Sequence, residues 1–189
     1  MDNKKSKEKH FKNFVKLVED IWQDFCFWNQ MQHPMYKSVY NKNLISWQII
    51  FRSVQDRLLL NLHEIFNNDL RKQTLDVYTL LRQIDNVELR DKFRKILCGN
   101  CELKMKIGEW RNNLVAHKNK QKIFKEKEEL ETKYKIVAGS IEAPILNLFE
   151  ILQKFQAYFT NESIDYDEKQ EEIKKEIGES LNKILLNNK

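Results

Sequence analysis

The sequence contains few of the residues that interrupt regular structure. Only 4 Gly and 2 Pro occur among its 189 residues. β-Sheets need turns at short intervals, and turns depend strongly on glycine and proline, so this composition argues against a sheet-rich fold. With 41% hydrophobic and 32% charged residues, the chain is expected to be all-α. Its length suits one domain with a sizeable core.

Several classes of protein are excluded by what is missing. The odd number of cysteines (Cys26, Cys98 and Cys101) indicates a reducing cytoplasm, not a secreted disulfide framework. No apolar run reaches the roughly 18 residues that span a bilayer, and the N-terminus lacks the apolar segment of a signal peptide. So few glycines also exclude phosphate-cradling loops. We therefore expect a cytoplasmic protein with no membrane segment and no nucleotide cofactor.

One cysteine pair has the spacing of a metal or redox motif, Cys98-Gly-Asn-Cys101. A structural zinc site needs four ligands, and the sequence contains no second pair. A thioredoxin-like site would need a βαβ context, which is also missing. The favoured interpretation is two small buried thiols at a helix bend, with no bound metal.

Apolar residues recur at helical spacing along most of the chain. They predict an antiparallel bundle of four or five main helices in a single domain of residues 1–189, with a core of about 9–160. Residues 161–189 should add a peripheral helix, docked on the core or on a second copy. The helices are predicted over residues 9–31, 43–65, 74–81, 85–97, 103–117, 140–159 and 167–186, and residues 118–135 remain either an exposed helix or an ordered loop.

The helix boundaries rest on capping residues and prolines. Asn43 and Thr74 are candidate N-caps, and either Asp85 or Asn86 can begin the following helix. Pro34 should end the first helix. Pro144 should lie in the first turn of the helix that Ser140 begins, where a missing N–H costs nothing.

The stretch GEWRNNLVAHKN, residues 108–119, carries the candidate chemistry. His117 continues the apolar series of Leu103, Ile107, Trp110 and Leu114, so a histidine stands where a leucine is expected. Between residues 104 and 127 there are eight Lys or Arg against two Glu. Such a field attracts polyanions, although a lysine-rich segment can simply be a solvated face. The candidate RNA-binding residues of this patch are Lys104, Lys118, Lys120 and Lys122.

Arginine and histidine at this spacing suit attack on a phosphodiester. A histidine of near-neutral pKa can take a proton from an RNA 2′-hydroxyl or give one to the leaving oxygen. Arginine offers a fork of donors to the phosphate oxygens, and no metal is needed. On one helix Arg111 lies about 9 Å along the axis from His117 and about 120° around it. Two copies across a two-fold axis would bring both pairs around one groove.

A structural interpretation stays open beside this one. His117 could be a core or interface histidine hydrogen-bonded to Asn113, which shares its helix face at i,i+4, with Arg111 reaching to water. Of the other histidines, His10 and His33 stand alone. His63 is followed by Glu64, which points to a different face of the helix, so the two form no dyad and indicate no catalysis.

The segment from Arg111 to His117 resembles the arginine–histidine signature of the HEPN superfamily. Residues 46–66 and 74–81 are similar to the AbiU-type, abortive-infection branch, so that the resemblance covers roughly residues 40–120. It implies an all-α bundle, a homodimer that builds the site, and metal-independent endoribonuclease activity in defence against phage or as a toxin. Arg111 would bind phosphate and His117 would be catalytic. Asn112 would be the polar residue after the arginine, and Asn113 a supporting residue.

The sequence therefore predicts a homodimeric HEPN ribonuclease that acts on RNA without a cofactor. A separate antitoxin or regulator chain is a further candidate partner. The alternative from another class is a catalytically silent helical interaction protein or toxin–antitoxin partner, in which Arg111 and His117 only shape an interface. A nucleotide-binding regulator is a third and weaker alternative.

Overall fold

The computed structural model describes residues 2–36, 44–66, 77–98, 101–116 and 138–187. These ranges are helical apart from short connections and contain no β-strand, which confirms the predicted all-α bundle. No helix within them is both long and apolar enough to cross a membrane. The elements are α1 (Asp2–Met31), the 3₁₀-helix η1 (Pro34–Tyr36), α3 (Leu44–Phe66), α4 (Val77–Arg82), α5 (Val87–Cys98), α6 (Cys101–Ala116), α8 (Ala138–Phe159) and α9 (Tyr166–Asn187).

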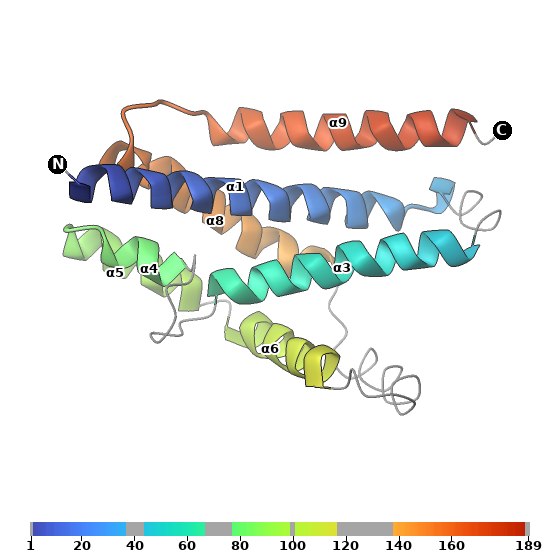
Figure 1. The fold of residues 1–189 in the computed structure, drawn as a ribbon, viewed down its shortest axis with the longest axis horizontal. Coiled ribbons are helices and arrows are strands. Elements are labelled where there is room, and N and C mark those ends of the chain that lie inside the picture. The colour runs from blue at the N-terminus through green and yellow to red at the C-terminus, as the bar shows by residue number, and fades with distance from the viewer. Residues whose placement is uncertain (1, 37–43, 67–76, 99–100, 117–137, 188–189) are drawn as a thin grey trace.

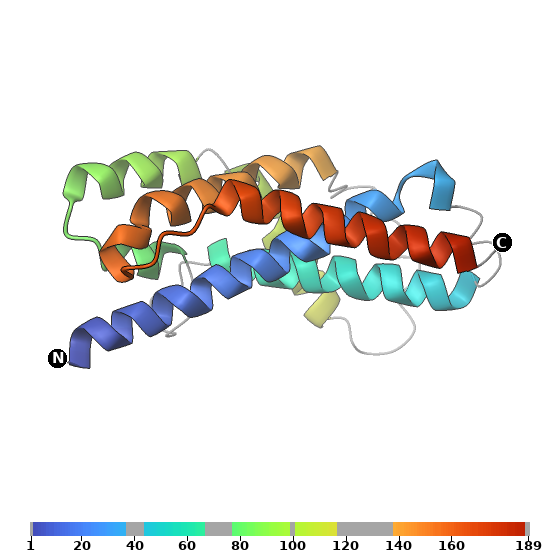
Figure 2. The ribbon, with the colours of Figure 1, turned by 90° about the horizontal axis from the view of Figure 1, so that it is seen from above.

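Helix α1 forms the centre of the bundle and packs against α3, α8 and α9. It runs in the direction opposite to α3, and α9 lies along its other side (Figures 1 and 2). Helix α6 packs against α3, on the side away from α1 (Figure 1). This arrangement makes α3 the element that links the core to α6, which carries the candidate chemistry.

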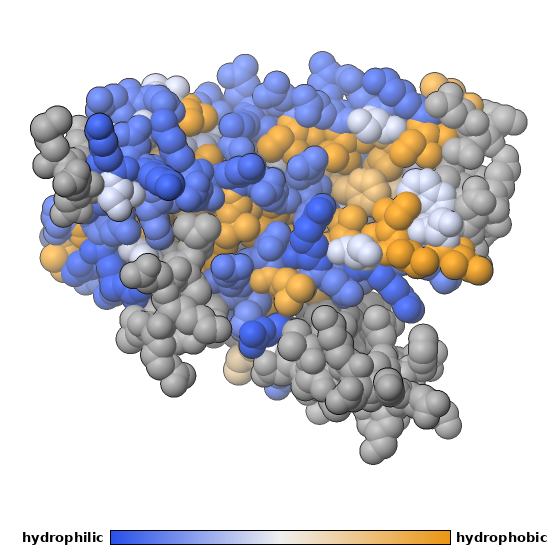
Figure 3. Space-filling view, in the orientation of Figure 1, coloured by the Kyte–Doolittle hydropathy of each residue, from blue (hydrophilic) through white to orange (hydrophobic). Residues whose placement is uncertain are grey.

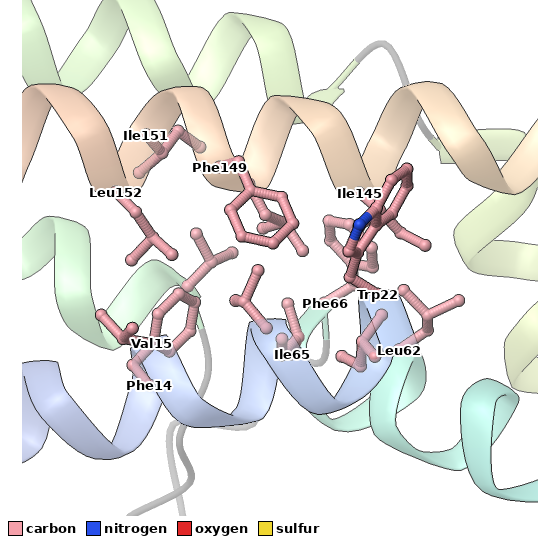
Figure 4. Close-up of a cluster of buried hydrophobic side chains, with 14 of the residues drawn as sticks. Phe14, Val15, Trp22, Leu62, Ile65, Phe66, Ile145, Phe149, Ile151 and Leu152 are labelled. Carbon is pink, nitrogen blue, oxygen red and sulfur yellow. The ribbon is translucent and has the colours of Figure 1, made fainter. Parts of the chain in front are cut away.

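The core is built largely from aromatic side chains of α1 and α8, together with leucines and isoleucines of α3 (Figure 4). Phe11 stacks on Phe159 with ring centroids 4.9 Å apart, and Phe93 meets Phe155 edge to face at the same distance. Full burial of such a side chain contributes roughly 1.5–3 kcal/mol relative to exposure. The predicted aromatic stripe of α1 is therefore the main hydrophobic face of the protein.

Two helix ends are defined by side-chain caps. The Leu89 amide donates to Oδ1 of Asn86 at 3.0 Å, so Asn86, and not Asp85, is the N-cap of α5. The amides of Asp167 and Glu168 donate to Oδ1 of Asp165 at the start of α9. The other predicted caps, Asn43 and Thr74, lie outside the described residues.

Two of the differences between predicted and observed helix starts have a physical cause that the sequence contains. Helix α1 begins at Asp2 and not at residue 9, because lysine and glutamate are good helix formers without any apolar periodicity. There Lys12 pairs with Glu8 at 3.2 Å and with Glu162 at 2.9 Å. Helix α8 begins at Ala138, so the prediction that Pro144 lies in the first turn was wrong. The proline removes one intrahelical hydrogen bond, while its ring is buried in the core.

Helix α9 docks on the core, the first of its two predicted positions. Trp22 of α1 donates from Nε1 to the Gln170 carbonyl at 3.0 Å, and Lys169 pairs with Glu19 at 2.6 Å. Leu181 near the other end of the helix is buried with Met31 and Tyr36. Contacts along its length therefore hold this polar helix against α1.

Candidate functional site

Arg111 is carried by α6, whose position is fixed by apolar contacts with α3. Leu103 and Ile107 of α6 are buried in the same cluster as Leu58 and Leu62 of α3. Lys104 and Arg111 are seven residues apart, which is two turns and about 10.5 Å along the axis, so their side chains leave one face of the helix. Both are half-buried.

His63 of α3 lies within the field of these two cations. It is half-buried in the last turn of its helix. Burial lowers the pKa of the imidazole, and the charges of Arg111 and then Lys104 lower it further. The three residues His63, Lys104 and Arg111 are called the basic cluster below. The imidazole is therefore held in its neutral form near pH 7, where it can accept a proton.

Sequence reasoning missed His63. Within α3 its neighbour Glu64 points to a different face of the helix, and the charges that act on His63 come from α6. The sequence contains only an indirect signal for His63. Lys104 and Arg111 are seven residues apart and lie on the face of α6 beside its apolar stripe. Side chains beside an apolar stripe lie near the helix against which that stripe packs. The sequence did not show that the neighbour would be α3, or that a histidine would stand there.

The lysine of the basic cluster is oriented by an aromatic ring. Nζ of Lys104 lies 5.3 Å from the ring centroid of Tyr78 in α4, within the range of a cation–π interaction. The neighbouring Lys106 instead pairs with Glu102 at 2.7 Å. Among the described residues, no carboxylate forms an ion pair with Lys104 or Arg111. The two cations of the basic cluster are thus not neutralised by the described part of the fold.

Gly108 separates Lys104 from Arg111 on this face of α6. A Cβ atom built on Gly108 would meet no atom within 4 Å. The helix therefore presents bare backbone with free space above it, one turn from each cation. Arginine provides a planar fork for phosphate oxygens and lysine a point charge, so the arrangement suits an anion that lies over the glycine.

The structure places the predicted site residues only in part. Arg111 lies in the second-to-last turn of α6, and Lys104 lies two turns before it. Asn112 and Asn113 belong to α6, but their side chains lie outside the description, as do residues 117–137. His117, Lys118, Lys120 and Lys122 therefore fall outside the described residues. The pairing of Arg111 with His117 stays a prediction.

The backbone places the two cysteines of the CxxC motif at the junction of two helices, and their side chains lie outside the description. Cys98 ends α5 and Cys101 begins α6, so the CxxC segment connects two helices. No group of three or more His, Cys, Asp or Glu side chains among the described residues is placed to hold a metal ion. Cys26 is buried in the core, and burial raises the pKa of its thiol to about 12. It therefore stays a protonated, unreactive thiol.

A comparison with protein-family models tests the family membership that the segment from Arg111 to His117 suggests. The model of the family HEPN_AbiU2, described as AbiU2, matches residues 7–177. The chain belongs to this AbiU2 family of HEPN proteins. The likeness expected for roughly residues 40–120 thus extends over most of the chain. Comparisons with curated proteins and with solved structures found no match. Membership identifies the chain as an all-α protein of an abortive-infection HEPN family.

Proposed function

We propose that this AbiU2-family protein is a metal-independent endoribonuclease that acts in phage defence by abortive infection or as a toxin. The observation that carries the proposal is the burial and charge environment of Arg111. It is half-buried on α6, and no carboxylate among the described residues pairs with it. An arginine in such a position is available to a phosphate group. Family membership supports the same assignment.

The proposed reaction is transesterification at one phosphodiester. His117 takes the proton of the 2′-hydroxyl, and the 2′-oxygen forms a bond to phosphorus. The bond from phosphorus to the 5′-oxygen breaks, and that oxygen leaves with a proton from a second imidazole. Arg111 stabilises the charge that develops on the non-bridging oxygens. The products are a 2′,3′-cyclic phosphate and a 5′-hydroxyl, with no redox change and no metal.

The second imidazole is the reason that the proposal includes a homodimer. An isologous interface presents the same patch from both subunits, so two copies of Arg111 and His117 would border one site. Asn112 and Asn113 are the proposed supporting residues. Lys104, Lys118, Lys120 and Lys122 would attract the RNA backbone, and RNA binding should therefore weaken as salt rises.

The proposal is tested by RNA cleavage in the presence of EDTA. Arg111→Ala and His117→Ala should each abolish cleavage, since general acid–base catalysis alone is worth about 10²–10⁴ in rate. Arg52→Ala, which removes an exposed arginine of α3, is the matched control and should cleave normally. Both site variants should unfold at the temperature of the unmodified protein. Intact RNA with the unmodified protein would refute the proposal.

A second candidate function is an interaction protein without nuclease activity. The observation that favours it is the apolar surface at the start of α3, where Ile45 is 75% and Ile49 is 60% exposed. Figure 3 shows apolar side chains gathered at the right of the molecule, where α3 begins in Figure 1. Exposed apolar patches often mark protein interfaces. If Arg111→Ala and His117→Ala lower thermal stability and no cleavage is found, this second function is the better account.

A further inference from the structure

The basic cluster joins two helices of one subunit, and one of its members has no place in the proposed reaction. We infer that His63, Lys104 and Arg111 form a binding site for one phosphate group, which lies over Gly108 between α3 and α6. That this phosphate belongs to RNA rests on the proposed function. The phosphate site itself rests on the geometry of the two helices.

The core sets the helix positions from which the three side chains extend. Leu62, next to His63, and Ile107, next to Gly108, are both buried in the main hydrophobic cluster. Their packing fixes α3 and α6 relative to each other. A site built on packed helices is held more closely than one built on loops. The cluster is therefore present before any ligand binds.

Lys104 and Arg111 can reach one anion from two sides. They leave the same face of α6 about two turns apart, and Gly108 stands between them without a side chain. The Tyr78 ring of α4 contacts Lys104, with its centroid 5.3 Å from Nζ. A phosphate over Gly108 would meet the ammonium group on one side and the guanidinium fork on the other.

His63 makes the site respond to pH. From α6 the charges that act on it are Arg111 and Lys104, and both oppose its protonation. On its own helix the next residue is the exposed Glu64, and Tyr78 of α4 contacts Lys104. No charge of α1 acts on it among the described residues. A bound phosphate offsets the two cations, so His63 takes up a proton and donates a hydrogen bond to the ligand.

His63 is thus a positioning residue, because it orients the phosphate that Arg111 binds. In the RNA complex this phosphate is a backbone phosphodiester. Inorganic phosphate offers the same oxygens and is the simplest probe of the site. The experiment must therefore separate free phosphate from an oligonucleotide.

The first measurement is an NMR pH titration of the histidine imidazoles in the full chain, with inorganic phosphate or with sodium chloride of equal ionic strength. Phosphate should raise the apparent pKa of His63 toward neutral pH. Each unit of increase corresponds to roughly tenfold tighter binding to the protonated form. The exposed His33 is the internal control for effects of salt that do not depend on the basic cluster. An unchanged His63, or equal movement of both histidines, would overturn the inference.

Gly108 offers a matched pair of variants. Gly108→Glu places a carboxylate between the two cations, so His63 should titrate at higher pH even without phosphate, and added phosphate should have no further effect. Gly108→Gln has the same size and no charge, and should leave the His63 titration without phosphate unchanged. If both variants behave alike, the cluster does not recognise negative charge over Gly108, and the inference fails.

The second arm uses a 2′-deoxy oligonucleotide, which cannot be cleaved by attack of a 2′-oxygen. His63→Gln should weaken its binding about tenfold at pH 6 and less at pH 8, because only the protonated imidazole adds a charged hydrogen bond. His117→Ala should keep the response of His63 to phosphate. Binding of phosphate without binding of the oligonucleotide would overturn the assignment to RNA.

The two proposals fail in different ways. If His63 responds to phosphate and to the oligonucleotide while RNA stays intact, the nuclease proposal falls and the phosphate site stands. If RNA is cleaved and His63 shows no response, the nuclease proposal stands and the phosphate site falls. The melting temperature of each variant shows whether it is folded. Lys104→Met removes a different member of the basic cluster and tests the same phosphate site independently.

Discussion

Burial lowers the pKa of His63 on α3, and the guanidinium of Arg111 on the neighbouring α6 lowers it further. The two residues come from separate helices of the same chain. Their coupling means that Arg111 has an electrostatic partner within its own subunit, whatever a second copy contributes. A change of charge at Arg111 should therefore be measurable in the titration of His63.

Removing the guanidinium should raise the pKa of His63. Arg111→Met keeps an unbranched apolar side chain on α6 and deletes the charge, so protonation of the imidazole becomes easier. The pKa is measured by NMR titration. Lys106→Met is the control, because Lys106 pairs with Glu102 and does not act on His63. Equal His63 titrations in the unmodified protein and Arg111→Met would show that the two groups are not coupled.

His63 should also make stability depend on pH. Its pKa is lower in the folded state than the unfolded value of about 6.5, so the unfolded state binds more protons in this range. The free energy of unfolding should therefore fall as the pH falls through about 6.5 and continue to fall down to the folded pKa. Urea unfolding between pH 5.5 and 7.5 measures this slope. His63→Gln should reduce the slope, and an identical slope would contradict the shift.

Asp24 of α1 and Arg57 of α3 form a second pair between helices, in which only the carboxylate is buried. Arg57 donates from Nε to Asp24 at 2.7 Å. Burial raises the pKa of Asp24 although Arg57 lowers it. Arg57→Ala leaves a buried, unpaired carboxylate and should cost about 3 kcal/mol at pH 7. Asp24→Asn leaves Arg57 to the solvent it already meets, and should cost less than about 1.5 kcal/mol.

The same pair has a defined pH dependence. A raised folded-state pKa means that the folded protein binds more protons than the unfolded chain. The penalty of Arg57→Ala should be small where Asp24 is protonated in both folded proteins. It should grow as the pH rises through the folded-state pKa of Asp24, which lies above the ordinary value of about 3.9. Urea unfolding at pH 4 and pH 7 measures the difference. A penalty of equal size at both values would mean that the carboxylate is not the cause.

Subunit mixing tests whether a site is shared. Arg111→Ala and His117→Ala proteins, each inactive alone, are unfolded together, refolded and assayed for RNA cleavage. A shared site keeps one intact arginine and one intact histidine in each mixed dimer. The leaving oxygen must then take its proton from water in place of the second imidazole, so only a small part of the activity should return. The control is the Arg111→Ala protein alone, unfolded and refolded in the same way. No recovery, together with a monomeric mass in sedimentation, would contradict the dimer proposal.

The fold could be predicted because its signals are local. The apolar stripe of α1 and the cap of α5 each depend on residues close together in the sequence. The structure confirms the stripe, and of the two predicted caps, Asp85 and Asn86, it selects Asn86. The early start of α1 was missed because periodicity marks only residues that are buried. Pro144 was misplaced because a helix can continue through a proline when the ring is buried and the lost hydrogen bond is offset by packing.

The candidate site could be predicted only as far as one helix reaches. The motif identified Arg111, and the basic patch identified Lys104. The place of His63 in the candidate site depends on the packing of α3 against α6, and no residue spacing within α3 indicates that packing. Its depressed pKa comes from burial and from charges on another helix, and both are properties of the folded chain.

The most direct test of the central claim is the rate of RNA cleavage in EDTA by the unmodified protein and by Arg111→Ala, His117→Ala and Arg52→Ala, all shown to be folded by their melting temperatures. Cleavage by the unmodified protein and Arg52→Ala, with a loss of at least about 10²-fold in each site variant, is the predicted result. Equal cleavage by all four proteins, or cleavage by none, would contradict the assignment of Arg111 and His117 as the catalytic residues of a metal-independent ribonuclease.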